Sequence, residues 1–133
     1  MLILPGGDAW ERGENTAAVA KAAEFLAVGV PVAAICAATF ALARAGFLDN
    51  RLHTSNAPDY LKASGYRGSS LYRNIPAIAD GSLITASGIA PVDFAYQIFG
   101  TLQLYPEPSL NAWYALFKRG DASKFNALAG AAR

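Results

Sequence analysis

The stretch from Pro31 to Phe40 constrains the fold most, because a strand pattern changes into a helix pattern there without a linker. The residues up to Cys36 are almost all apolar, as in a fully buried strand. A helical pattern opens directly after Cys36 and stops at Gly46, a residue type that often ends helices. Such an elbow presents the residue at its bend at the carboxyl end of a parallel sheet, where open α/β folds keep their sites.

Cys36, the residue at this bend, is the only cysteine of the chain. The unpaired N–H groups and the dipole at a helix amino terminus stabilise a thiolate, which is the nucleophilic form of cysteine. The alternative is that Cys36 is a small buried hydrophobic residue, which is a common role for a free cysteine. The residues alone do not decide between these two interpretations.

The first half of the chain has the order strand, helix, strand, helix. Residues 1–4 predict a buried strand that runs into Pro5-Gly6-Gly7-Asp8, either an ordinary tight turn or a loop whose N–H groups face a ligand. Apolar residues at helical spacing from Val19 to Leu26 predict a helix, capped by Asn15 or Thr16. This order is typical of a parallel sheet with crossover helices.

The second half predicts a hairpin followed by helices. Asp80-Gly81 is a strong two-residue turn signal between extended residues 75–79 and a strand over 82–87. Pro91 suits the first position of a helix that ends before Pro106. A short helix is expected over 57–64, with Asn56 as its cap.

The tail from Tyr105 predicts two more helices. The first carries Trp113 and Phe117 on its apolar stripe, and the second carries Phe125 after a possible cap at Asp121. Aromatic residues at this spacing usually pack in a core, and we interpret them in this way.

Composition excludes several classes of function. A formal net charge of +1 gives no electrostatic footprint for nucleic acid or an anionic membrane, and no apolar run is long enough for a membrane span. A single cysteine fits a reducing compartment. The sequence holds no metal-ligand cluster, phosphate loop or dinucleotide fingerprint, and no basic region of a signal peptide. We therefore expect a cytoplasmic protein without a cofactor, a metal, a nucleic-acid partner or a membrane partner.

Several segments, in their order and spacing, resemble the ThiJ/PfpI family of the class I glutamine amidotransferase-like superfamily. They cover the chain to about residue 104 and are LPGG at 4–7, AICAAT at 34–39, ARAGFLD at 43–49, HTSN at 53–56, Asp80-Gly81 before a strand, and ASGIAP at 86–91 before a helix. The resemblance implies an α/β fold, a flavodoxin-like three-layer sandwich with a mostly parallel sheet. It also implies that Cys36 is the nucleophile and that the backbone N–H groups of Gly7 and Ala37 form an oxyanion hole.

The resemblance leaves the partner of the cysteine open. Some relatives carry a histidine in the loop after the elbow helix, and His53 lies in that loop as a candidate acid–base residue. The alternative is an exposed loop histidine, and in the strictest register Ser55 takes the position instead. Asp8, Glu11 and Glu14 lie close to the Gly-Gly loop, where we interpret them as a solvated turn.

At two positions this sequence lacks residues that other members of the superfamily carry, and each difference bears on its expected activity. PfpI-type peptidases carry a histidine directly after the nucleophile, whereas this chain has Ala37 at that position. Glutamine amidotransferases place histidine and glutamate after a later strand, and residues 87–91 hold neither. A glutaminase is therefore a poor fit to this sequence.

Residues 1–133 are expected to form a single ThiJ/PfpI-like domain, the C-terminal portion of the family fold with a helical tail over 105–133. The chain starts inside a strand, and two clearly parallel strands are few for a doubly wound sheet. We expect a fold that is incomplete at the amino terminus, its first βα units absent or supplied by another chain. The acidic residue that contacts the cysteine in the family would belong to those units. A homo-oligomer, most simply a dimer, is expected.

Three functions follow as hypotheses. The first is a cysteine-dependent hydrolase or lyase, peptidase-like, amidase-like or glyoxalase-like, that acts on a small carbonyl or amide substrate. The second is a non-enzymatic stress protein whose Cys36 is oxidised by peroxide. The third is a truncated relative without activity. The same reactive thiol serves the first two, so the sequence does not separate them.

Overall fold

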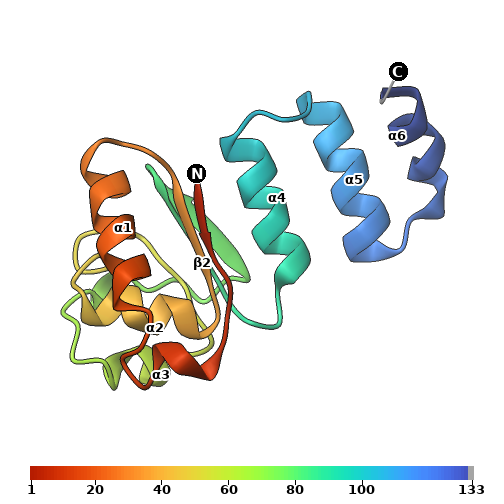
Figure 1. Cartoon of the computed structure of the whole chain (residues 1–133). Coiled ribbons are helices and arrows are strands. Elements are labelled where there is room, and N and C mark those ends of the chain that lie inside the picture. The colour runs from red at the N-terminus through yellow and green to blue at the C-terminus, as the bar shows by residue number, and fades with distance from the viewer. Residues whose placement is uncertain (132–133) are drawn as a thin grey trace.

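A four-stranded sheet forms the centre of the protein, whose computed structural model describes residues 1–131 (Figure 1). The strand order is β1-β2-β4-β3, where the first three run parallel and β3 is antiparallel to β4. The strands are β1 (Leu2–Leu4), β2 (Val32–Ile35), β3 (Ala77–Asp80) and β4 (Leu83–Ala86). The predicted strands and the mostly parallel sheet are confirmed.

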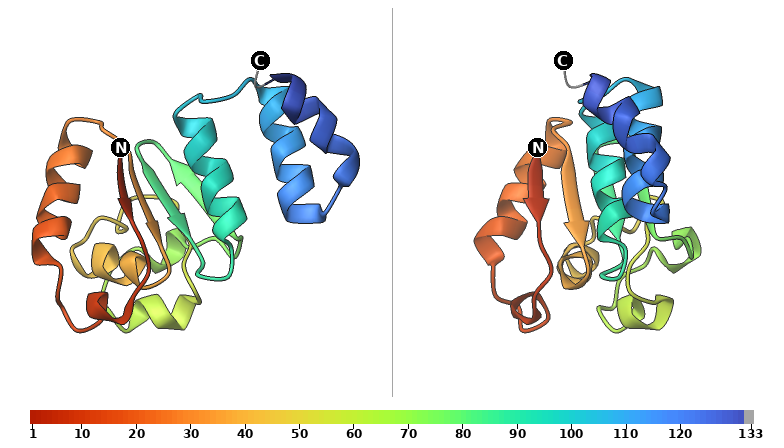
Figure 2. Two further views of the ribbon diagram at one scale, coloured as in Figure 1. Left: turned by 45° about the vertical axis from the view of Figure 1, so that its right-hand side comes forward. Right: turned by 90° about the vertical axis from the view of Figure 1, so that its right-hand side faces the viewer.

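Helices cover both faces of this sheet, which gives three layers (Figures 1 and 2). One face carries α1 (Thr16–Ala27) and α2 (Ala37–Arg44), and the other carries α4 (Pro91–Thr101). Alternate residues of a strand point to opposite faces, so β2 contributes Val32 and Ala34 to one core and Ala33 to the other. All three are fully buried, as expected for a strand covered on both faces.

The turn between β3 and β4 follows the predicted chemistry. Asp80 pairs with Leu83 at the end of the antiparallel ladder, and Gly81 between them has φ +57°. Glycine adopts this left-handed conformation without steric cost, which explains the strong turn signal. The helix that follows begins at Pro91, as predicted.

The tail forms α5 (Glu107–Arg119), which packs on α4, and α6 (Phe125–Ala131), which packs on α5 (Figure 2). Asp121 caps a short 3-10 turn, Ala122–Lys124, between them. The expectation that the tail aromatics are core residues is wrong for Phe117 and Phe125, whose exposed fractions are 60% and 64%. The described residues leave these two rings uncovered, although α5 packs against both α4 and α6.

Shorter elements complete the loops near the carboxyl ends of the strands. They are α3 (Pro58–Lys62) and the 3-10 turns η1 (Asp8–Trp10) and η2 (Ser69–Leu71). Ala57 occupies the N-cap position of α3 without a side-chain cap, so the prediction that Asn56 caps this helix is wrong. Asn15 does hold the N-cap position of α1, although its side chain makes no capping hydrogen bond. No helix within residues 1–131 combines the length and apolarity needed to cross a membrane.

Candidate active site around Cys36

The carboxyl ends of the three parallel strands converge on Cys36. Cys36 follows β2 directly, Gly6 lies just after β1, and Gly88 lies just after β4. The antiparallel β3 begins at the same edge, so the residues before it also lie there. This edge is where open α/β sheets place their sites.

The backbone of Cys36 adopts an unusual conformation. Its φ of 59° and ψ of −129° lie outside the regions that non-glycine residues normally occupy. The surrounding structure holds it there: its N–H donates to the Ala86 carbonyl at 3.0 Å, and Thr39 Oγ1 donates to its carbonyl at 2.6 Å. A strained residue between a strand and a helix is the geometry of a nucleophile elbow.

Two glycines make room for the Cys36 side chain. A Cβ atom on Gly88 would lie 2.8 Å from the Cys36 sulfur, and one on Gly6 would lie 2.9 Å from the Cys36 Cβ. Neither position accepts a side chain without displacement of Cys36. Cys36 as a residue is partly exposed to solvent.

Asn56 contacts the sulfur from the loop after α2. Its Nδ2 donates to Cys36 Sγ at 3.5 Å, and its Oδ1 accepts the Gly88 N–H at 2.9 Å. The bond from the Gly88 N–H to Oδ1 fixes the orientation of the amide, because only Nδ2 is then left to contact the sulfur. The side chain therefore links the loop after β4 to the thiol.

The two peptide groups predicted as an oxyanion hole flank the same residue. The Ala37 N–H is in the first turn of α2, where helical N–H groups have no partner within the helix. Gly7 lies one residue beyond the Gly6 contact and is exposed. Their role as donors to an oxyanion stays a prediction.

His53 lies in a buried polar and aromatic environment. Its ring is fully buried, with Nδ1 2.7 Å from the Arg51 carbonyl and Nε2 3.0 Å from the Tyr66 hydroxyl. A carbonyl can only accept, so Nδ1 carries the proton and Nε2 accepts from Tyr66. The rings of Tyr66 and Tyr72 both meet the imidazole edge to face. Burial is the main cause that lowers the pKa of His53 below its usual value.

These contacts separate His53 from the thiol. Neither of its ring hydrogen bonds joins it to Cys36, and the alternative of an exposed loop histidine is wrong. Ser55 lies nearer in the network, because its Oγ is 2.6 Å from Thr39 Oγ1, which bonds the Cys36 carbonyl. The acid–base role of His53 stays a prediction that its geometry does not favour.

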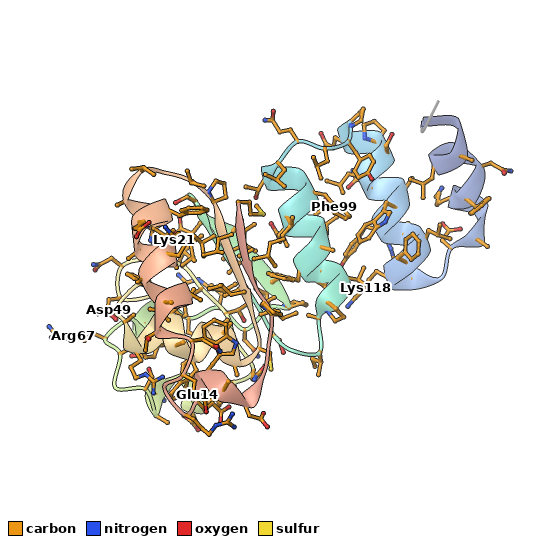
Figure 3. The ribbon with its side chains drawn as sticks, viewed as in Figure 1. Glu14, Lys21, Asp49, Arg67, Phe99 and Lys118 are labelled. Carbon is orange, nitrogen blue, oxygen red and sulfur yellow. The ribbon has the colours of Figure 1, made fainter. Side chains whose placement is uncertain are left out.

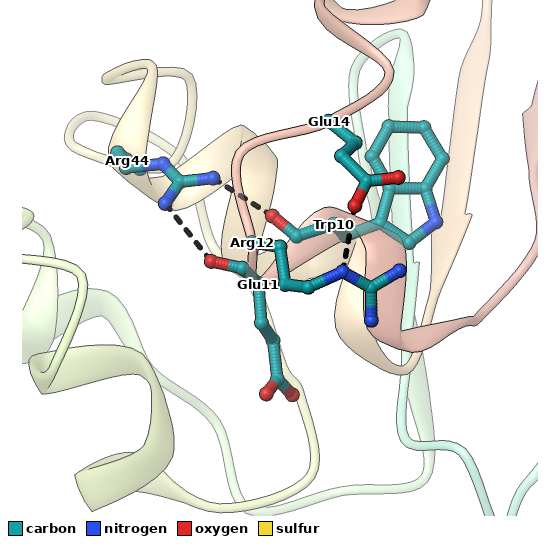
Figure 4. Close-up of polar contacts among 5 residues, drawn as sticks. All are labelled: Trp10, Glu11, Arg12, Glu14 and Arg44. Carbon is teal, nitrogen blue, oxygen red and sulfur yellow. Dashed lines mark hydrogen bonds and ion pairs between the residues drawn. The ribbon is translucent and has the colours of Figure 1, made fainter.

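The loop after β1 is held firmly against α2. Trp10 Nε1 donates to the Pro5 carbonyl at 2.7 Å, and Arg44 of α2 donates to the Trp10 carbonyl at 2.8 Å and to the Glu11 carbonyl at 3.4 Å (Figure 4). These bonds fix the backbone that carries Gly6 and Gly7. The loop is thus part of the site's framework.

Glu11 and Tyr60 border the site. The Tyr60 hydroxyl donates to Glu11 Oε1 at 2.6 Å. Burial, the bond to Glu11 and the negative charge of a Cys36 thiolate all raise the pKa of Tyr60. Glu14 instead pairs with Arg12 at 2.6 Å on the exposed surface, as expected for a solvated turn (Figure 4).

A cavity of about 270 Å³ opens next to the residues around Cys36. Asn56 lines it, so one side chain contacts both the cavity and the Cys36 sulfur. The other walls come from Ser55, residues 74–76, Ser87, Ile89, Ala90 and Lys118 of α5. Within residues 1–131, no three His, Cys, Asp or Glu side chains gather as a metal site requires.

Sequence reasoning missed Asn56, Gly88 and the pair of Glu11 and Tyr60. Asn56 belongs to the HTSN segment at 53–56, so the sequence pointed to this segment but not to the contact between Asn56 and the sulfur. The pair of Glu11 and Tyr60 joins residues 49 positions apart, and no local pattern predicts such a contact.

Comparison with known proteins agrees with this architecture. Residues 1–100 match the DJ-1/PfpI family. The chain is 40% identical over 120 residues to the "uncharacterized protease YoaZ" of Bacillus subtilis, a match that covers 89% of this chain and 57% of that protein.

The solved structures that resemble this chain also come from this family. A thiJ/pfpI family protein from Bacillus anthracis superposes with a TM-score of 0.93 at 39% identity, covering 98% of this chain and 62% of that one. A DJ-1 superfamily protein from Agrobacterium tumefaciens gives a TM-score of 0.77 at 37% identity, covering 89% and 64%. The chain thus spans about three-fifths of the length of these relatives. The expected flavodoxin-like fold is confirmed, and the chain belongs to the DJ-1/PfpI (ThiJ/PfpI) family.

Proposed function

We propose that this protein is a cysteine-dependent hydrolase or lyase in which Cys36 attacks a small carbonyl or amide substrate. The observation that carries the proposal is the elbow conformation of Cys36, a partly exposed residue with φ 59° whose side chain is bounded by Gly6, Gly88 and Asn56. A strained backbone costs free energy and persists only where its surroundings impose it, which is common at active sites. The protease name of the relative YoaZ supports the hydrolase class.

The chemistry begins with a bond between Cys36 Sγ and the carbonyl carbon. The π electron pair of the carbonyl moves to its oxygen, and the N–H groups of Ala37 and Gly7 donate to the resulting oxyanion. With an amide substrate, return of that pair expels the amine, which takes a proton, and leaves a thioester on Cys36. Water then attacks the thioester, releases the acid and regenerates the thiol.

Asn56 has a positioning role in this scheme. Its N–H donates to the sulfur, and a donor to a charged acceptor stabilises that acceptor more than a neutral one. The bond from Gly88 N–H holds the amide in the orientation that this requires. This scheme does not use His53, whose ring nitrogens bond to the Arg51 carbonyl and the Tyr66 hydroxyl.

The test combines turnover with the chemical state of Cys36. Wild-type protein and the Cys36→Ser variant are given a panel that contains a 2-oxoaldehyde and short peptide anilides, and each product is quantified. Turnover that Cys36→Ser abolishes supports the enzyme. The matched control is Ser64→Ala, which removes a hydroxyl that follows α3 and bonds the Leu61 carbonyl, and it should leave turnover unchanged.

Peroxide treatment followed by intact-mass measurement separates the remaining hypotheses. Stoichiometric oxidation of Cys36 without turnover of any substrate overturns the enzyme and favours the peroxide sensor. A thiol that neither turns over a substrate nor reacts with peroxide in the folded protein favours the inactive relative.

A further inference from the structure

We propose that the 270 Å³ cavity beside Cys36 binds the carboxylate of a small anionic substrate, with Lys118 as the charged anchor. The inference deepens the proposed function and rests on it for the identity of the reacting group. The substrate class is a short carboxylic acid that carries a second carbonyl close to its carboxylate.

The cavity walls suit an oxygen-rich anion. The amides of Asn56 and Asn74, the hydroxyls of Ser55 and Ser87 and the ammonium of Lys118 all line it. Lys118 is the one charged side chain among the described lining residues, and no carboxylate lines the cavity. A volume of about 270 Å³ lies just below the usual range for ligand pockets, so the site suits a small molecule.

Lys118 is held in place by a buried carboxylate. It extends from α5 to α4, where its Nζ lies 2.7 Å from Asp93 Oδ2 (Figure 3). Asp93 also accepts the Tyr114 hydroxyl at 2.6 Å, so its charge is shared between two donors. An ammonium has three N–H donors, and the bond to Asp93 uses one of them.

The cation of this ion pair is more exposed than the carboxylate, as a site that binds an anion requires. The Lys118 side chain is 37% exposed, whereas the Asp93 side chain is 9% exposed. The carboxylate therefore lies beneath the ammonium and orients it, while the ammonium stays accessible from the cavity that it lines. A bound carboxylate would complete the coordination of Lys118 by charge-assisted hydrogen bonds.

The cavity and the thiol share a wall. Asn56 lines the cavity and donates to Cys36 Sγ, and Gly88, which packs against the sulfur, lies between the lining residues Ser87 and Ile89. A carboxylate at Lys118 would thus direct the rest of a short molecule toward this wall. The carbonyl that Cys36 attacks would lie on the part of the molecule that reaches this wall.

The first test measures binding and does not depend on Cys36 chemistry. Propionate and its neutral analogue propionamide are titrated into the protein in low-chloride buffer, and side-chain amide shifts of Asn56 and Asn74 are followed by NMR. We expect saturable binding of propionate, at least fivefold tighter than that of propionamide. Lys118→Gln should remove this preference and Lys118→Arg should retain it. The matched control is Lys124→Gln, a lysine that pairs weakly with Asp121 and does not line the cavity.

The absence of saturable propionate binding to the wild-type protein overturns the inference. So does a preference for propionate that survives in Lys118→Gln. Thermal melts of each variant check that the fold is retained. Lys118→Arg shows whether the preference for propionate depends on the positive charge rather than on the Asp93 contact alone.

The second test separates this inference from the proposed function. Rates of Cys36 alkylation by iodoacetate and iodoacetamide are compared by intact mass, and Lys118→Gln should lower the ratio of the two rates about three- to tenfold. If both reagents react and the ratio is unchanged, the carboxylate site fails and the nucleophile stands. If propionate binds through Lys118 but neither reagent reacts with the folded protein, the proposed function fails and the anion site alone remains.

Discussion

Asn56 lies in the loop after α2 and Cys36 lies at the elbow between β2 and α2, yet the Asn56 amide donates to the Cys36 sulfur at 3.5 Å while the Gly88 N–H donates to the Asn56 carbonyl oxygen. The donor to the thiol is therefore Asn56 Nδ2, and the Gly88 N–H fixes its orientation from the opposite end of the amide. This relationship ties the loop after α2 and the loop after β4 to a single reacting atom.

Replacement of Asn56 by Ala should slow alkylation of Cys36 about tenfold, because the N–H donor that stabilises the thiolate is lost. Hydrogen bonds to charged groups contribute about 1.5–3 kcal/mol, and the 3.5 Å distance places this one at the low end. The rate is measured by intact mass after iodoacetamide pulses at several pH values. Asn50→Ala, an exposed amide in the loop after α2, is the matched control and should react as the wild type. An equal rate in both variants would show that the Asn56 contact has no effect on the thiol.

The close approach of Gly88 gives a second prediction. Gly88→Ala would place a methyl group 2.8 Å from the sulfur, so either the sulfur or the loop after β4 must move. We expect alkylation to fall at least tenfold and unfolding to require less denaturant. Gly130→Ala is the control, because a Cβ at Gly130 meets no atom within 4 Å. Wild-type reactivity in Gly88→Ala would mean that the loop yields without loss of the site.

The fold was largely predictable because its signals are local. The elbow at Cys36, the turn at Asp80-Gly81 and the helix start at Pro91 each depend on a few neighbouring residues with strong backbone preferences. The apolar run of β2 also required burial on both faces, which only a sheet between helix layers provides.

The site was less predictable because its contacts are distant in sequence. Asn56 looked like a helix cap, since asparagine before a proline-initiated helix commonly has that role, but Gly88 and Cys36 compete for its amide. His53 looked like a proton carrier because it is the one histidine in the right loop. Its burial among Tyr66 and Tyr72 depends on the tertiary packing of η2, which no local pattern reveals.

The environment of His53 predicts a specific dependence of stability on pH. Burial lowers the pKa of the folded imidazole below 6.5, so the unfolded chain binds the proton more readily. The free energy of unfolding should therefore fall as the pH drops below about 6.5, with a slope of up to about 1.4 kcal/mol per pH unit from this one residue.

Urea unfolding of the wild type and of His53→Gln between about pH 7 and pH 5 checks this slope. The difference between the two slopes isolates His53, because the other titrating groups are common to both proteins. Cys36 alkylation should be unchanged in His53→Gln. A large loss of alkylation with an unchanged pH slope would instead restore His53 as the partner of the thiol.

Asp93 joins α4 to the tail and should contribute to stability only above acidic pH. Burial alone raises the pKa of Asp93, but the hydrogen bonds from Lys118 and Tyr114 outweigh it and lower the pKa below 3.8. The stabilisation is present above that unfolded value and is lost as the pH falls through the folded one. Asp93→Asn should lower the free energy of unfolding by about 1–3 kcal/mol near neutral pH and by progressively less in acid.

Thermal or urea melts at neutral and acidic pH measure this difference. Asp59→Asn is the control, because Asp59 pairs with Lys62 on an exposed surface where such pairs contribute little. A deficit in Asp93→Asn that is the same in acid as at neutral pH would show that the carboxylate charge is not its source.

The free edge of the sheet predicts self-association. Among the described residues, β1 pairs only with β2, so its outer backbone groups lack strand partners, and Ile3 on this strand is 50% exposed. An unpaired and partly apolar edge is a template for another chain, and a charged side chain at such an edge opposes pairing. We expect sedimentation velocity to show a mass that rises with protein concentration, and Ile3→Lys to shift the protein toward the monomer. Val28→Lys is the control, because Val28 is 73% exposed but follows α1 and is not part of β1. A wild-type protein that sediments as a monomer at every concentration, or an equal response of both variants, would rule out β1 as the associating surface.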